Sequence, residues 1–226
     1  MGLMAGDVRT RSDFSVDVSV AEILATPPFP RWASSTASAT DLAATVDRLA
    51  APVASALDIR AIYRSVRTTE SGIEAFDPPP DLTRAEFVVP GVLTIGDGVH
   101  QSGSTDGLLD GLVADAMENV ALHLARVEML EEIREAAWND GFCTTRAFPP
   151  GVRGDGWPLE NRRFMFETLP TERIGVYLRD GRVTAPRKTF AFAMGVDANI
   201  EQADLLLSCA ECEYASDCPY VGSIVK

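Results

Sequence analysis

The sequence has few of the residues and patterns on which several common functions depend. Its only histidines, His100 and His123, lie far apart without a neighbouring nucleophile, and it contains no Walker-type phosphate loop. No apolar run of about 18 residues occurs, so the sequence predicts no membrane span. The 20 Lys and Arg residues face 33 Asp and Glu residues, and the net charge of −13 argues against nucleic-acid binding.

The N-terminal residues also lack a basic region followed by an apolar run. Residues 1–13 are mostly polar and show no periodicity, so we expect them to be frayed. Without a secretory signal, the chain is predicted to be cytoplasmic and to keep its thiols reduced.

Cysteine is scarce but clustered. Three of the four cysteines, Cys209, Cys212 and Cys218, form a C-x2-C-x5-C-P run. Thiolates at this spacing can turn toward one centre, and a proline follows the last ligand in bacterial ferredoxin runs. The pattern predicts a metal site, with a 4Fe-4S cluster favoured and zinc as the alternative. A disulfide framework is disfavoured in a reducing compartment.

The fourth cysteine, Cys143, lies far from the others in sequence. It completes a four-thiolate site only if the fold brings it back to Cys209, Cys212 and Cys218. The alternative is that Cys143 is a small core or strand-edge residue, because buried cysteine is common.

Length and patterning indicate a mixed α and β protein of 226 residues. Pro78-Pro79-Pro80 is the best internal boundary, which separates an N-terminal segment 1–80, part of the same fold or a small subdomain, from residues 81–226. We expect helices from Thr40, over 107–138 and over 159–169, and strands at 59–66, 87–96, 174–178 and 189–194. The strand at 87–96 is predicted to be broken by Pro90-Gly91.

Five short motifs in the second half occur in a characteristic order: 146–152 (RAFPPGV), 157–160 (WPLE), 164–169 (FMFETL), 174–178 (IGVYL) and 186–189 (PRKT). Together they resemble the reactivation domain of cobalamin-dependent methionine synthase. The resemblance is closer to stand-alone relatives of that domain, which often carry a terminal cysteine cluster. It covers about residues 85 to 220.

The resemblance implies an α+β fold, a twisted antiparallel sheet with flanking helices, that binds S-adenosylmethionine. In that chemistry cob(II)alamin on a partner domain or protein gains one electron, and the resulting cob(I) takes the methyl group. The implied function is an accessory or reactivation protein for a corrinoid-dependent methyltransferase, with no nucleic acid or membrane as partner. The sequence does not decide whether the chain itself is an enzyme, and no feature of it indicates an oligomeric state.

The resemblance also implies ligand-binding residues. Arg146 opens the Pro-Gly loop, and its planar fork suits the ligand's carboxylate, while Gly151 lets the backbone approach closely. Glu118 aligns with the acidic residue on the family's long helix and suits the amino or sulfonium charge. The alternatives are a surface ion pair for Arg146 and a solvated helix face for Glu118.

The chain departs from the family at Val152, where the relatives carry tyrosine, so an aromatic hydroxyl near the ligand is missing. Trp157 could supply an aromatic wall instead, although a tryptophan beside proline is more often a packing anchor.

The cysteine cluster suggests a role in this chemistry, because reduction of cob(II) needs a strong one-electron donor, which an iron–sulfur cluster can be. The chain would then deliver an electron, a methyl group or both. The alternative is a non-catalytic docking module for a corrinoid protein, with a structural zinc or iron–sulfur site.

Overall fold

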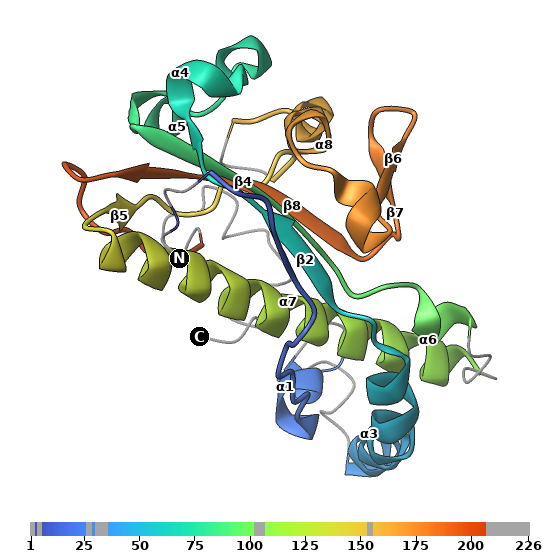
Figure 1. The fold of residues 1–226 in the computed structure, drawn as a ribbon. Helices are drawn as coiled ribbons and strands as arrows, with labels where there is room; N and C mark the ends of the chain where they lie inside the picture. The colour runs from blue at the N-terminus through green and yellow to red at the C-terminus, as the bar shows by residue number, and fades with distance from the viewer. Residues whose placement is uncertain are drawn as a thin grey trace.

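The computed structural model describes residues 3, 6–25, 29, 36–101, 107–152 and 156–206. At its centre an antiparallel sheet has the strand order β1-β2-β4-β8-β5, and β3 also pairs with β4 (Figure 1). The strands of this sheet are β1 (Arg9–Arg11), β2 (Arg60–Tyr63), β3 (Val66–Arg67), β4 (Phe87–Thr94), β5 (Cys143–Thr144) and β8 (Thr189–Asp197). Helices flank both faces of the sheet. The predicted α+β class, with a twisted antiparallel sheet and flanking helices, is confirmed.

The central strand β4 is continuous, so the predicted break at Pro90-Gly91 is wrong. Pro90 lies opposite Ala193, and Ala193 directs its own N–H and C=O to Phe148 on the other side. The missing N–H of Pro90 therefore costs the β4–β8 ladder no hydrogen bond. Gly91 lies under the ring of Phe192, where a Cβ atom would overlap the ring.

The N-terminal region is also more ordered than predicted. Residues 9–11 form β1, which pairs with β2 in the register Arg9↔Tyr63, and Leu3 is buried in the core with 2% exposure. The outer side of this edge strand meets solvent and charged side chains, so its residues are polar. A search for apolar periodicity in the sequence therefore does not detect the strand.

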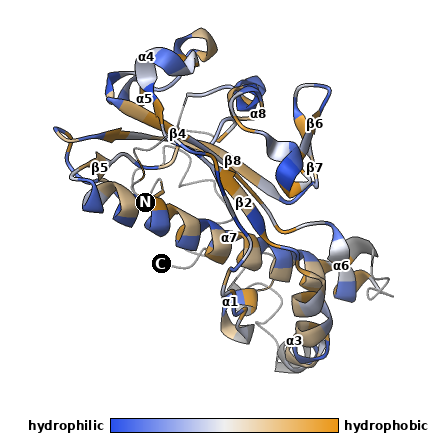
Figure 2. Cartoon of the chain, in the orientation of Figure 1, coloured by the Kyte–Doolittle hydropathy of each residue, from blue (hydrophilic) through white to orange (hydrophobic). Residues whose placement is uncertain are grey.

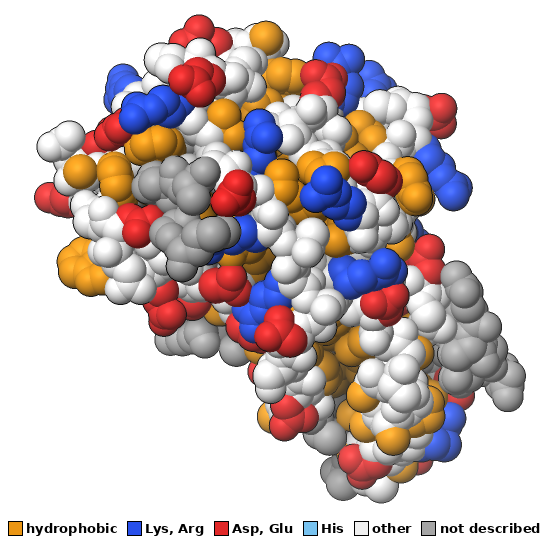
Figure 3. Space-filling model, in the orientation of Figure 1, with side chains coloured by type: hydrophobic (Ala, Val, Ile, Leu, Met, Phe, Trp, Pro, Cys, Tyr) orange, Lys and Arg blue, Asp and Glu red, His pale blue; other side chains and the backbone are white. Residues whose placement is uncertain are grey.

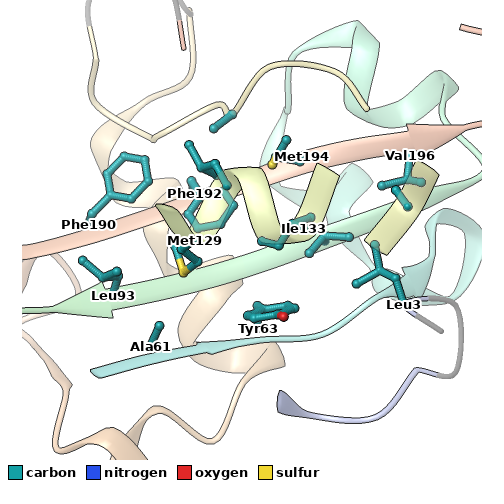
Figure 4. Close-up of a cluster of buried hydrophobic side chains, with 14 of the residues drawn as sticks. Leu3, Ala61, Tyr63, Leu93, Met129, Ile133, Phe190, Phe192, Met194 and Val196 are labelled. Carbon is teal, nitrogen blue, oxygen red and sulfur yellow. The ribbon is translucent and has the colours of Figure 1, made fainter. Parts of the chain in front are cut away.

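The longest helix, α7 (Leu108–Asn139), agrees closely with the predicted 107–138. It ends in a Schellman turn: Gly141 has φ +88°, and the N–H of Phe142 donates to the carbonyl of Ala137 at 2.9 Å. Blue hydrophilic bands recur along α7 between hydrophobic ones (Figure 2). Met129 and Ile133 pack from α7 against Leu93 and the Phe190–Phe192 stack (Figure 4).

The opposite face of the sheet carries a second core. Buried side chains there include Trp157, Phe164, Met165 and Ile174, which pack on Val88, Val92 and Ala193. The short elements that supply this layer are α4 (Thr68–Ser71), η2 (Ile73–Phe76), α5 (Pro80–Arg84), η3 (Leu159–Arg162), α8 (Arg163–Thr168) and η4 (Thr171–Ile174). A separate hairpin, β6 (Tyr177–Arg179) and β7 (Val183–Ala185), follows them.

A third cluster joins helices α1 (Val20–Ala25) and α3 (Thr36–Ala56) to the first half of α7. Helix α3 begins four residues before the predicted cap at Thr40 and contains Pro52. A short helix before α7, α6 (Gly98–Gln101), lies near α3. Among the described residues, no helix combines the length and apolarity needed to cross a bilayer. Strands β1 and β2, from residues before the expected boundary at Pro78–Pro80, belong to the same sheet as β4 and β8.

Candidate functional site

The Pro-Gly loop that begins at Arg146 runs along the outer edge of β8. The N–H of Thr145 donates to the carbonyl of Gly195, and Phe148 exchanges two hydrogen bonds with Ala193 at 2.9 and 3.1 Å. The guanidinium of Arg146 lies 4.1 Å from the centre of the Phe148 ring. Phe148 belongs to the core layer that contains α8, so Arg146 lies on that side of the sheet edge.

Beyond Phe148 the loop leaves β8. Gly151 has φ +88°, a conformation that favours glycine, and its N–H donates to the carbonyl of Trp157 at 2.8 Å. Its Cα faces Leu159 so closely that a Cβ would lie 2.5 Å from Leu159 Cδ1. Val152, at the end of the motif, is 43% exposed. The loop is therefore anchored at Phe148 and Gly151.

The departure of the loop leaves part of β8 open. Because Ala193 points its N–H and C=O toward Phe148, Ala191, two residues earlier, points its own in the same direction. Among the described residues, no strand pairs with β8 on this side at Ala191. The open edge can offer one backbone donor and one acceptor to a ligand.

Polar side chains of α7 gather on the other side of this edge. Lys188, at the start of β8, donates from Nζ to Asp115 Oδ1 at 2.7 Å and to Asn119 Oδ1 at 2.6 Å. Two turns along α7, Arg126 donates to Nδ1 of His123 and lies 5.7 Å from the centre of the Phe190 ring. Burial lowers the pKa of Arg126 to about 10, so it remains a cation at neutral pH.

Glu118 lies on α7 within this region and is 1% exposed, so it is not on a solvated helix face. A carboxylate is rarely buried to this degree, because desolvation disfavours its charged form unless other groups compensate. Arg146 stacks on Phe148 in the layer that contains α8, whereas Glu118 belongs to α7 in the other layer, so a ligand that contacts both would have to pass the edge of the sheet.

Trp157 is a packing residue in this structure. It is 2% exposed, it packs against Phe164, and its Nε1 donates to the carbonyl of Phe76 at 2.9 Å. Of the two roles that the sequence allowed for Trp157, a packing anchor or an aromatic wall for the ligand, its burial agrees with the packing anchor. The backbone carbonyl of Trp157 accepts the hydrogen bond from Gly151, so the buried indole fixes the residue that closes the Gly151 turn.

Cys143 lies on the edge strand β5 and is a half-buried free thiol. The predicted ligands Cys209, Cys212 and Cys218 lie outside the described residues. The chain that leads to them does run beside β5: Ala203 donates to the carbonyl of Thr144, and Ala147 donates to that of Leu205. Within the described part of the chain, no group of three His, Cys, Asp or Glu side chains is placed to hold a metal ion.

A groove of about 960 Å³, which the sequence did not indicate, lies between β1 and the second half of α7. Its lining residues are Arg9, Thr10, Arg11, Asp13, Tyr63, Glu128, Glu131, Glu132 and Glu135. Arg11 pairs with Glu128 and Glu132, and the hydroxyl of Tyr63 donates to Glu132. Burial, followed by the hydrogen bond to Glu132, raises the pKa of Tyr63 to about 12. The sequence signal that could have indicated this groove is the series of glutamates at helical spacing on α7, Glu128, Glu131, Glu132 and Glu135.

A comparison with solved structures identifies this architecture. The chain aligns with a crystal structure of the MetH reactivation domain bound to AdoHcy, with a TM-score of 0.56 and 13% identity, over 93% of this chain and 85% of that one. The fold is that of the MetH reactivation domain. No protein-family model matches the chain, and no curated protein matches it. At this identity the likeness establishes the MetH reactivation-domain fold, and it agrees with the fold that the motifs at 146–189 imply.

Proposed function

We propose that this protein is an accessory protein of a corrinoid-dependent methyltransferase that binds S-adenosylmethionine and presents its methyl group to cobalt on a partner. The observation that carries the proposal is the loop from Arg146 to Val152, anchored beside an open strand edge. It occurs in a fold shared with a domain that was crystallised with AdoHcy.

The loop offers suitable chemistry for such a ligand. Arg146 would bind the carboxylate through two guanidinium N–H groups, with its orientation restrained by the Phe148 ring. Ala191 would contribute backbone hydrogen bonds at the open edge of β8. Glu118, the position that resembles the family's acidic residue, would face the amino or sulfonium charge across that edge. Gly151 would set the path of the loop without a side chain.

The proposed reaction is methyl transfer to a corrinoid carried by the partner. The partner's cobalt, once reduced by one electron, would accept the methyl group from S-adenosylmethionine, and S-adenosylhomocysteine would leave. The residues named here would bind and orient the sulfonium, so that its methyl group faces outward to the partner.

The electron could come from the cysteine segment. Cys209, Cys212 and Cys218 have the spacing of iron–sulfur ligands, and residues 203–205 bring the chain beside Thr144 and Ala147, close to Cys143 in sequence. A zinc ion held by the same thiolates would instead only stabilise the tail.

A second candidate function is a docking module for a corrinoid protein that does not bind S-adenosylmethionine. Val152 favours this alternative, because the hydroxyl carried by relatives at this position is missing. The burial of Trp157 leaves no aromatic replacement from that residue.

Titration calorimetry with S-adenosylmethionine separates the two functions. We expect binding to the native protein, and we expect Arg146→Ala to weaken it by about 1.5 to 3 kcal/mol, the range for a hydrogen bond to a charged group. Arg67→Ala is a matched control, because Arg67 also stacks on a phenylalanine, Phe87, but lies far from the loop in the sheet. Its affinity should equal that of the native protein.

The Val152→Tyr variant tests the departure from the family. If the native protein binds weakly and Val152→Tyr binds more tightly, the missing hydroxyl limits affinity. Absence of heat with both proteins would reject S-adenosylmethionine binding and leave the docking module.

A further inference from the structure

The β6–β7 hairpin projects from the main sheet and has two different faces. Asp180 and Gly181 form its turn with φ values of +51° and +67°, typical of a type I′ hairpin. The register pairs Tyr177 with Ala185 and Arg179 with Val183. Paired residues share a face, so these four side chains point away from the molecule, whereas Thr184 on the other face is 6% exposed.

The outer face is unusually apolar for an exposed ribbon. Tyr177 and Val183 are each 57% exposed and lie diagonally across the two strands. Single exposed hydrophobic residues need no explanation, but neighbouring ones on a rigid element often mark an interaction surface. Tyrosine and arginine are also the residues most enriched at the energetic centres of protein interfaces, and Arg179 completes this group.

The surface continues from the hairpin to the Pro-Gly loop. Arg182 pairs with Glu160 at 3.2 Å, and its carbonyl accepts a hydrogen bond from Arg162. These contacts join the hairpin to η3, where Leu159 is 39% exposed and packs against Gly151. We call Tyr177, Arg179, Val183, Arg182 and Leu159 the hairpin face.

The segment that carries the hairpin face is basic in sequence within an acidic protein, and its Arg187 and Lys188 are paired with Asp115 of α7. Residues 159–188 contain seven of the 20 Lys and Arg residues but only four of the 33 Asp and Glu residues, a local charge of +3 against a total of −13. Arg173 and Arg179 are exposed and form no ion pair within the described chain. Lys and Arg side chains, interspersed with Asp and Glu, are visible over the region where α8 and the hairpin lie (Figure 3).

We infer that the hairpin face docks the corrinoid-carrying partner. The apolar side chains of the face would contact an apolar patch on the partner, and carboxylates around that patch would pair with the arginines of the face. The inference rests on the proposed function and names the surface through which the partner arrives. Charge complementarity selects an acidic partner surface and orients its approach. Nucleic acid fits less well, because the acidic remainder of the molecule would repel a long polyanion.

The position of the hairpin explains why the corrinoid carrier is the partner. Strand β7 leads through Pro186 into Arg187 and Lys188, and from there into the open part of β8. Leu159 contacts Gly151 at the other end of the hairpin face. A protein bound to this surface would overhang the loop where the methyl donor is proposed to lie, which is where cobalt must be.

The test measures binding of the purified, cobalamin-loaded corrinoid domain of the methionine synthase from the same organism, by biolayer interferometry at several salt concentrations. We expect Arg179→Glu and Tyr177→Ser each to weaken binding about tenfold or more, the range for residues at an interface centre. Arg179→Glu should also reduce the salt dependence. Arg84→Glu is the matched control, because Arg84 is exposed and without an ion pair within the described chain but lies on α5.

Equal affinities for native protein, Arg179→Glu and Arg84→Glu would overturn the inference. Two other occupants are checked directly. A dimer in light scattering that Tyr177→Ser dissociates would assign the face to a second copy, and single-stranded DNA binding lost in Arg179→Glu would assign it to nucleic acid.

Calorimetry separates this inference from the proposed function. Arg179→Glu should retain S-adenosylmethionine binding, so loss of docking with retained ligand binding supports the hairpin face, and native protein that binds ligand but no corrinoid domain refutes it.

Discussion

Gly91 shows how a single residue permits the central pair of strands. The Phe192 ring, stacked at 5.1 Å on Phe190, occupies the space where a side chain at position 91 would lie. Pro90 and Gly91 predict a strand break from the sequence. In the sheet, Ala193 tolerates Pro90 because it makes no hydrogen bond to it, and the Phe192 ring requires glycine at position 91. A local rule failed there because the deciding contact comes from about a hundred residues away.

We expect Gly91→Ala to lower the free energy of unfolding by about 1 to 3 kcal/mol, because the added methyl group must displace the Phe192 ring. Gly111→Ala is the matched control: nothing lies within 4 Å of a Cβ atom there, and the residue is within α7. It should raise stability by about 0.5 to 1 kcal/mol. Denaturant unfolding of both variants checks the pair, and a neutral Gly91→Ala would contradict the packing described here.

Residue-level features of the candidate site were partly predictable. Arg146 and Gly151 were named through the resemblance of the motif at 146–152, and their role in ligand binding stays a prediction; the structure places both in the loop beside β8. The burial of Glu118 was not predictable, since burial depends on which face of a helix meets the core. Trp157 is the packing anchor that the sequence offered as an alternative, whereas Glu118 is buried and is not on a solvated helix face.

At the scale of elements, side-chain ion pairs stabilise β1 between β2 and α7 more than its short backbone ladder does. Three residues pair with β2, while Arg11 reaches Glu128 and Glu132 on α7. Helix α7 was predictable nearly to the residue because its length and its terminating glycine are local signals. Strand β1 was not, because its stabilising partners are Tyr63 and the glutamates of α7, which the sequence places far away.

We predict that Arg11→Met releases β1 and lowers the free energy of unfolding by about 1 to 3 kcal/mol, because two part-buried carboxylates lose their cation. The exposed pair of Arg67 and Glu86 is the control: Arg67→Met should cost less than about 1 kcal/mol. Hydrogen exchange at residues 9–11 checks the mechanism. Unchanged protection in Arg11→Met would mean that backbone pairing alone holds the strand.

At the scale of the whole molecule, the cysteine segment decides whether methyl capture and electron delivery belong to one chain. We expect anaerobically purified protein to contain iron and acid-labile sulfide, because the C-x2-C-x5-C-P spacing suits an iron–sulfur cluster. Cys212→Ser should lose the metal. Retention of metal in Cys143→Ser would show that the half-buried thiol on β5 is not a ligand. Stoichiometric zinc without iron would assign the segment a structural role.

The pairing of β4 with β8 has a consequence for how this protein is made. On one side residues 87–94 pair with the preceding strands β2 and β3, but on the other side their partner is residues 189–196, so a ribosome must release almost the whole described chain before the sheet can close. Until then the apolar strand β4, buried on both faces in the finished protein, has no neighbour on one side and is open to aggregation. Slow translation or truncation before Thr189 should therefore harm yield more than changes anywhere in the loops.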